Sequence, residues 1–322
     1  MKYILPTEKS GFAPEVIPLL NALPDDGLFH EKYQLMHPCD VYSSVFEEAV
    51  ESGLKLTRDV LCMHEKKANG GSDNELDLSI KNGTFHFLFS MTNFLDGCQS
   101  IIKSLFEDTK SKDFTRANRE FLSSIREYND YVRKSVNYIK HRHRVVRTIY
   151  GSWEENLIIG YYIEGVVTKG MLGPDPDIHN ESNCAISLNR DIPYHLCNIF
   201  SVSAVLASLV RNRFKLKLSD IKSYKNQDER ILKFIDSASK LPRTYFPDEL
   251  KMNWPEINLK SENQLAKIIY PSSRKPDNMR LHDMKISLSS TVRSRSRSLK
   301  LPYFGHEETY INANKALQRT SR

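Results

Sequence analysis

The stretch Thr84–Phe106, TFHFLFSMTNFLDGCQSIIKSLF, carries large apolar residues at steps of three and four positions. This spacing places them on one face of a single α-helix. They are Phe85, Leu88, Met91, Leu95, Cys98, Ile102 and Leu105. Because so continuous an apolar face belongs in a core between other helices, this stretch predicts a mainly α-helical protein.

A helix is predicted on each side of this stretch. Val41–Glu65 has apolar residues at helical spacing and is followed by the polar loop KKANGGSDNE. Arg119–Val146 has a comparable pattern, with apolar residues at Leu122, Ile125, Val132, Val136, Ile139 and Val146. Only the short charged segment EDTKSKD separates this helix from Thr84–Phe106, so the two should lie antiparallel.

The chain then changes to a β pattern. Leu157–Val167, LIIGYYIEGVV, is rich in β-branched and aromatic residues, and CAISL at Cys184–Leu188 is predicted to be a second short strand. The dipeptide after the first strand, Lys169-Gly170, supplies a turn. Another helix should follow, with Asp191 as its N-cap and Pro193 in its first turn.

These patterns divide the chain into four regions. We expect an N-terminal arm over 1–40 and a helical body over 41–214 with a small β-hairpin insert at about 157–188. A helical and irregular region over 215–290 should contain a helix at Ser219–Lys240, and a basic flexible tail should occupy 291–322.

Composition narrows the class of protein. Hydrophobic residues make up 40% and charged residues 27% of the 322 residues, which is typical of a globular protein. No apolar run approaches the roughly 18 residues that cross a bilayer, and the start lacks a signal peptide, so we expect a cytoplasmic protein with no membrane partner. The five cysteines form no CxxC pair. We therefore expect reduced thiols, no metal and no cofactor.

The charge is unevenly distributed along the chain. Residues 291–322 hold seven Lys or Arg against two Glu, so this tail carries +5 of the net charge of +6. Within the body, the segment Arg133–Arg147, RKSVNYIKHRHRVVR, has six Lys or Arg and two His in fifteen residues and no acid. A phosphate preference of the folded part would have to come from such a local cluster.

One stripe of this cationic helix lies away from its apolar side. At about 100° per residue, Arg133, Asn137, His141 and Arg144 align about 100° to 180° from the buried positions. A histidine flanked by arginines suits RNA cleavage, since imidazole moves protons near neutral pH and guanidinium neutralises the charge that develops on phosphorus. The alternative is a solvated basic face whose cations pair with acids elsewhere in the chain.

The two long amphipathic helices, with the pattern N-x-x-x-H at Asn137–His141 near the end of the later one, resemble the HEPN superfamily over Asp40–Phe214. The resemblance implies a HEPN-like helical bundle. Active ribonucleases of that family place two Arg…His motifs across a homodimer interface and use no metal. The resemblance therefore implies that His141 is the general acid and base and that Asn137 positions the His141 ring.

The family pattern has an arginine four to six residues before the histidine, often followed directly by Asn or Asp. Val136 stands where that arginine would precede Asn137. Arg133, Arg142 or Arg144 would then have to bind the phosphate. The remaining members of the proposed phosphate-binding set are Lys140, His143 and Arg147.

Two other residue sets are weaker candidates. Arg190 and His195 are separated by four residues, which matches the family's spacing, and could face the His141 stripe if the β insert folds the chain back. Asp175, Asp177 and His179 could bind a divalent metal. On a loop as rich in Pro and Asp as GPDPDIH, however, such residues more often form turns.

The end of the chain, ANKALQRTSR, resembles the translated ends of bacterial integron gene cassettes. Cassette residence would favour an accessory role in phage defence or as part of a toxin–antitoxin pair. Two functions remain open. The first is a homodimeric RNA-engaging protein that cleaves RNA without a metal. The second is a non-catalytic, antitoxin-like protein that uses the same basic helix to bind an acidic partner, such as an antitoxin or defence component.

Overall fold

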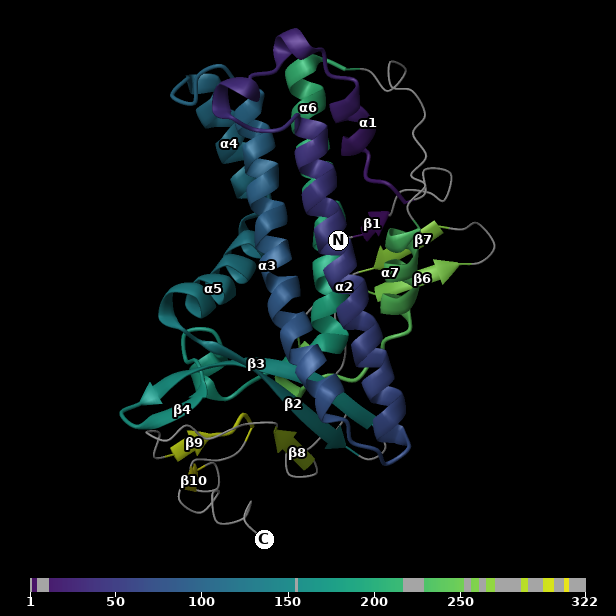
Figure 1. The fold of residues 1–322 in the computed structure, drawn as a ribbon, viewed down its shortest axis with the longest axis vertical. Coiled ribbons are helices and arrows are strands. Elements are labelled where there is room, and N and C mark those ends of the chain that lie inside the picture. Colours follow the sequence, from purple (N-terminus) through teal and green to yellow (C-terminus); the bar gives the residue numbers. More distant parts are fainter. Residues whose placement is uncertain are drawn as a thin grey trace.

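Two antiparallel helices of 31 residues each, α2 (Pro38–Ala68) and α3 (Asn74–Ser104), form the centre of the computed structural model (Figure 1). The structure describes residues 2–4, 12–153, 156–216, 229–251, 256–260, 265–269, 285–288, 298–303 and 310–312. Each central helix has a side-chain cap: the His37 ring accepts the Cys39 N–H, and Asp73 accepts the Leu76 N–H. The predicted helices at Val41–Glu65 and Thr84–Phe106 are confirmed, and the protein is mainly helical.

Other helices cover this central pair. α6 (Leu188–Phe214) contacts both α2 and α3, and its outer side is covered by α1 (Val16–Asn21) and α4 (Lys112–Ser124). α7 (Arg230–Ser239) packs on α2, and α5 (Arg126–Arg142) packs on α3 (Figure 1). Short 3-10 helices occupy Asp25–Gly27, Glu31–Tyr33, Asn180–Ser182 and Pro247–Lys251.

The prediction of one continuous helix over Arg119–Val146 is wrong. The chain breaks at Ile125, whose backbone leaves the helical region (φ −109°, ψ 9°) between α4 and α5. α5 then ends at Arg142 because His143 adopts a left-handed conformation with φ 53°. Val146, predicted to lie on the helix seam, is instead a buried residue of the first strand of the sheet.

A small antiparallel hairpin unit follows α5 and starts earlier than the predicted insert. Its strands are β2 (Val145–Trp153), β3 (Asn156–Thr168) and β4 (Met171–Pro174), with a turn at Gly170 (φ 80°). The CAISL segment supplies only the two-residue strand β5 (Ile186–Ser187), which pairs with β3. Strands from late in the chain extend this sheet. They are β8 (Lys285–Leu288) beside β2, β9 (Ser298–Lys300) beside β4, and β10 (Tyr310–Asn312) beside β9.

A second, smaller sheet pairs the N-terminal strand with two strands from the later part of the chain. β1 (Lys2–Ile4) pairs with β7 (Leu265–Ile269), which pairs with β6 (Glu256–Lys260). The expected flexible tail is also partly structured, because Lys300 is buried in β9 and the Tyr303 hydroxyl donates to Asp248 at 2.6 Å. Much of the predicted helix at Ser219–Lys240, and most of the tail, lies outside the described residues.

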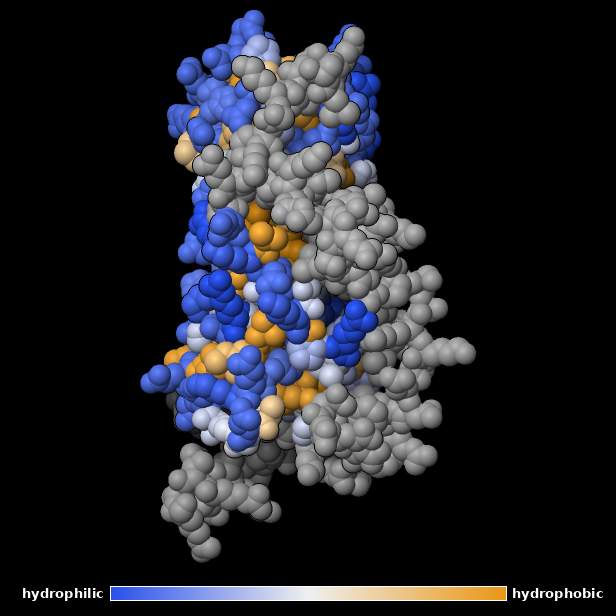
Figure 2. All heavy atoms as spheres, turned by 90° about the vertical axis from the view of Figure 1, so that its right-hand side faces the viewer, coloured by the Kyte–Doolittle hydropathy of each residue, from blue (hydrophilic) through white to orange (hydrophobic). Residues whose placement is uncertain are grey.

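One hydrophobic core runs through the helices and reaches one face of the sheet. Close helix packing depends on glycine at Gly53 of α2, where a Cβ atom would lie 2.4 Å from the ring of Phe234 in α7. On the face shown in Figure 2, most of the coloured surface is hydrophilic and hydrophobic atoms appear as a central band of patches.

The helix α6 begins at Leu188, three residues before the predicted N-cap Asp191. Among the described residues it is the single helix long and apolar enough to span a membrane by length and composition. Of its most apolar window, 67% is buried inside the molecule, as in the core helix of a soluble protein.

Candidate functional site

The cationic end of α5 is presented on the surface because the opposite side of the helix is anchored in the core. Tyr128, Val132, Ser135, Val136 and Ile139 are buried against the bundle. Five of the predicted site residues lie exposed on the other side or at the end of the helix, together with Lys134, which was not predicted. Lys134, Asn137, Lys140, His141, Arg142 and His143 are exposed.

Two arginines of the predicted stripe are neutralised by acids from other elements. Arg133 lies 2.5 Å from Asp96 of α3 and donates to Asn129 at 2.8 Å. Arg144 lies 2.7 Å from Asp175, whose side chain is 1% exposed. Of the stripe, Asn137 and His141 therefore remain as the exposed polar groups between two ion pairs.

Arg147 lies in the core. It donates to both oxygens of Glu164 across the β2–β3 pair, at 3.1 and 2.9 Å, and both side chains are buried. This bidentate pair satisfies the guanidinium group inside the protein. Arg147 is therefore a structural residue and we do not include it in the surface site.

Arg142 is held by two neighbours. Its Nη1 lies 3.2 Å from Asp177 Oδ2, and its guanidinium carbon lies 4.1 Å from the centre of the Tyr138 ring, one helical turn earlier. The Tyr138 hydroxyl donates to the same Asp177 oxygen at 2.7 Å. This hydrogen bond, assisted by the charge of Arg142, lowers the pKa of Asp177 and keeps it ionised.

Five exposed side chains on the second half of α5 and at its C-cap have no ion-pair or hydrogen-bond partner among the described residues: Lys134, Asn137, Lys140, His141 and His143. We call this set the α5 end. It combines two permanent cations with an amide and two imidazoles. Such a group can attract an anion and exchange protons with it.

The loop residues considered as metal ligands do not converge. Asp175 pairs with Arg144, Asp177 pairs with Tyr138 and Arg142, and the His179 ring accepts the backbone N–H of Ile163 at 2.8 Å. Burial lowers the pKa of His179 to about 3, so its ring stays neutral. In the part of the chain that the structure describes, no three His, Cys, Asp or Glu side chains form a metal-binding group.

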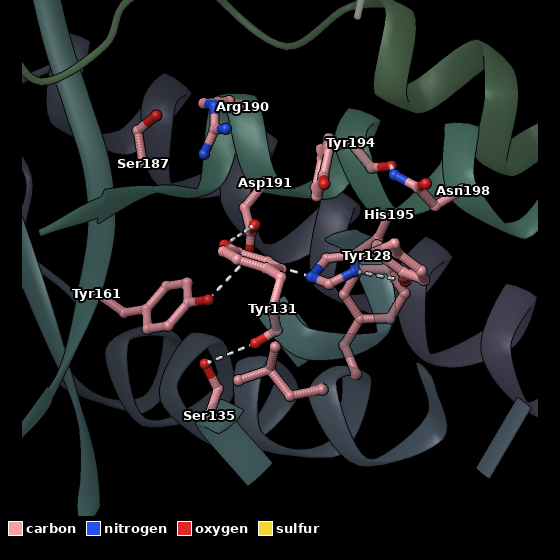
Figure 3. Close-up of polar contacts among 12 residues, drawn as sticks. Tyr128, Tyr131, Ser135, Tyr161, Ser187, Arg190, Asp191, Tyr194, His195 and Asn198 are labelled. Atoms are coloured by element: carbon pink, nitrogen blue, oxygen red, sulfur yellow. Dashed lines mark hydrogen bonds and ion pairs between the residues drawn. The ribbon is translucent and has the colours of Figure 1, made fainter. Parts of the chain in front are cut away.

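His195 belongs to a buried polar network between α5 and the start of α6, and Arg190 lies beside it with its side chain 12% exposed (Figure 3). Asp191 is the centre of this network: it accepts hydrogen bonds from Tyr131 at 2.6 Å and Tyr161 at 2.8 Å. His195 Nε2 lies 3.3 Å from Asp191, and Nδ1 lies 2.8 Å from the Tyr128 hydroxyl. The network thereby joins α5, β3 and α6.

Charge balance keeps Asp191 ionised in this network. Burial alone would raise its pKa, but His195, Tyr131 and Arg190 together outweigh burial and lower it. Burial raises the pKa of Tyr128, Tyr131 and Tyr161 far above their usual range, so they act as hydroxyl donors or acceptors.

His195 has no exposed surface and therefore cannot contact RNA in this structure. Neither the tyrosine partners nor Asp96 was predicted from the sequence. The available signal was weak: Tyr128 and Tyr131 lie three residues apart on the apolar side of α5, where a hydroxyl requires a buried partner. The network is a support for α5, since its two tyrosines fasten that helix to α6.

A second buried acid lies beside the network. Glu249, in the 3-10 helix Pro247–Lys251, accepts the backbone N–H groups of Ser187 and Phe246, both at 3.0 Å, and lies 3.9 Å from Arg190. Burial raises its pKa from 4.5 to about 7, despite these favourable contacts.

We expect the stability contributed by Glu249 to fall as the pH rises. Between about pH 4.5 and 7 the folded state holds a proton that the unfolded state has released. The contribution is fully present below about 4.5 and is lost as the pH passes about 7. Thermal melting of wild type and Glu249→Gln at several pH values measures it: the wild type should lose stability relative to the variant from pH 5 to pH 8.

The quantity to follow is the difference in stability between wild type and Glu249→Gln, because His64 and His179 change the stability of both proteins with pH in the opposite direction. Burial lowers the pKa of both, so their contributions fall on acidification, equally in wild type and variant. A stability difference that is constant over this range would contradict the raised pKa of Glu249.

Comparison of the chain with protein-family models, with curated proteins and with solved structures finds no match.

Proposed function

We propose that this protein binds RNA through the α5 end. The observation that carries the proposal is the set of exposed side chains left after the arginines have found acids: Lys134, Asn137, Lys140, His141 and His143 have no such partner among the described residues. Two lysines can contact phosphates, and asparagine and imidazole can form hydrogen bonds with sugars and bases.

The proposal includes the setting expected from the sequence. The resemblance to the HEPN superfamily favours RNA as the ligand and a homodimer as the working form. The cassette-like C-terminal segment favours a bacterial accessory role in the cytoplasm, in defence or with a toxin–antitoxin partner.

Metal-independent RNA cleavage is the second candidate, favoured by the exposure of His141 and by the position of Asn137 one turn before it. Here His141 would move the proton and Lys140 or Arg142 would neutralise charge on the phosphate. Arg133 is less suited to this role than its sequence position indicates, since Asp96 already neutralises it.

The binding proposal predicts a salt-dependent affinity that Lys134→Ala/Lys140→Ala weakens. For single-stranded RNA, each phosphate contact contributes about 0.7 to the slope of log K against log salt. Removing two contacts should therefore reduce the slope by about 1.4. Fluorescence anisotropy with a labelled RNA, repeated over a range of salt concentrations, measures this.

Lys110→Ala/Lys112→Ala is the matched control, because it removes two exposed lysines near the start of α4. This helix precedes α5, and its start lies far from the end of α5 (Figure 1). It should leave the slope unchanged. Equal losses in the two double variants would show that only net charge matters, and the α5 end would not be the binding site.

The same RNA, analysed on a denaturing gel after incubation in EDTA, tests cleavage. Cleavage by the wild type that is lost in His141→Ala would support the second candidate. Intact RNA with the wild type would leave binding as the function.

A further inference from the structure

Arg142, the last residue of α5, differs from the other arginines of its segment in keeping an exposed side chain. Its side chain is 53% exposed, whereas that of Arg144 is 20% exposed and that of Arg147 is 6% exposed. The Arg142 guanidinium group is nevertheless fixed in place, because the Tyr138 ring lies 4.1 Å from its central carbon and Asp177 lies 3.2 Å from Nη1.

Tyr138 is fixed in turn by the hydrogen bond from its hydroxyl to Asp177 at 2.7 Å. The three side chains thus hold one another: the ring covers the guanidinium, and one carboxylate oxygen binds both groups. Holding a long side chain in advance removes part of the entropy cost that a ligand would otherwise have to overcome on binding.

We propose that Tyr138 and Arg142 form a stacking platform for an unpaired nucleic-acid base. The inference rests on the proposed function, and it specifies the ligand as a single strand. Unpaired bases stack on aromatic rings and on guanidinium planes, whereas bases inside a duplex are already stacked on each other. Lys140 and His141 lie within two residues of Arg142 and can contact the adjoining phosphates.

Arg142→Lys is the decisive substitution, because it keeps the positive charge and removes the plane. Loss of one stacked base should weaken binding by about tenfold. The slope of affinity against salt should stay as in the wild type, since the number of cations is unchanged. The residue is exposed, and thermal melting checks that the variant is folded.

The probes are an adenine-only RNA of about 12 nucleotides, the DNA strand of the same length, and an RNA duplex of the same length. We expect Arg142→Lys to lose affinity for both single strands, since stacking does not involve the 2′-hydroxyl, and to bind the duplex as the wild type does. Tyr138→Phe keeps the ring but loses the bond to Asp177, and should show a smaller loss on the single strands alone.

Wild-type affinity of Arg142→Lys for both single strands would overturn the platform. An equal loss on the duplex, or a loss on RNA but not on DNA, would also overturn it. If these results exclude the platform while Lys134→Ala/Lys140→Ala still weakens binding, the protein binds RNA through the α5 end without stacking a base on Arg142. If the wild type binds none of the three probes, both proposals fail.

Discussion

Asp191→Ala is expected to lower the free energy of unfolding by about 3 to 5 kcal/mol. The carboxylate accepts the hydroxyls of Tyr131 and Tyr161 and faces His195, all in the core. Alanine would leave these polar groups buried with their shared partner removed, and each such group carries a desolvation cost. Urea denaturation followed by circular dichroism measures the change.

The expected loss is specific to the buried position. Asp130→Ala removes an aspartate from the exposed side of α5, where its side chain is 67% exposed, and should change stability by less than about 0.5 kcal/mol. Tyr161→Phe removes one donor and should cost about 1 kcal/mol. If Asp191→Ala were as mild as Asp130→Ala, the network would not fasten α5 to α6.

Arg147→Ala is expected to destabilise the protein by a similar amount, about 3 to 5 kcal/mol, because it leaves the carboxylate of Glu164 buried without its cation. From the sequence, Arg147 was predicted to contact phosphate, and this role and the structural role predict different results. A structural role lowers stability and leaves the RNA affinity of the folded fraction unchanged. Melting and anisotropy on the same sample separate them.

The double variant Arg147→Met/Glu164→Leu tests the physical cause. Replacing both members of a buried ion pair by apolar residues of similar size is often neutral or stabilising, since no uncompensated charge remains. Most of the stability lost in Arg147→Ala should therefore return. A double variant as unstable as the single one would indicate that the pair contributes a specific geometry, and not only charge balance.

The central helices were predictable because their signal is local. The apolar spacing within Thr84–Phe106 determines which side of α3 is buried, and this needs no knowledge of the rest of the fold. The early start of the β unit was harder to predict. The segment from Val145 continues a helical pattern in sequence, and only the left-handed turn at His143 separates helix from strand.

Most residues of the candidate site could be predicted from the sequence, but the ion pairs that neutralise some of them could not. The segment Arg133–Arg147 has no acid of its own, so its cations appeared available. Their partners come from other elements: Asp96 lies 37 residues before Arg133, and Asp177 lies 35 residues after Arg142. Pairing over such separations depends on tertiary packing, and a single sequence does not contain it. What remains exposed, including His141, is a smaller site than the sequence indicated.

The short parallel pairing of β9 with β4 has a consequence for solubility. A strand at the end of a sheet offers unpaired backbone groups on which another chain can add. Ser298–Lys300 pairs with the free edge of β4. The Lys300 ammonium also donates to the carbonyl of Glu181 at 3.1 Å, which helps to hold β9 in place. A segment predicted to be a charged appendage thus covers the edge of the hairpin and leaves the three-residue strand β10 as the edge of the sheet on this side, and so short an edge strand offers little backbone for intermolecular pairing.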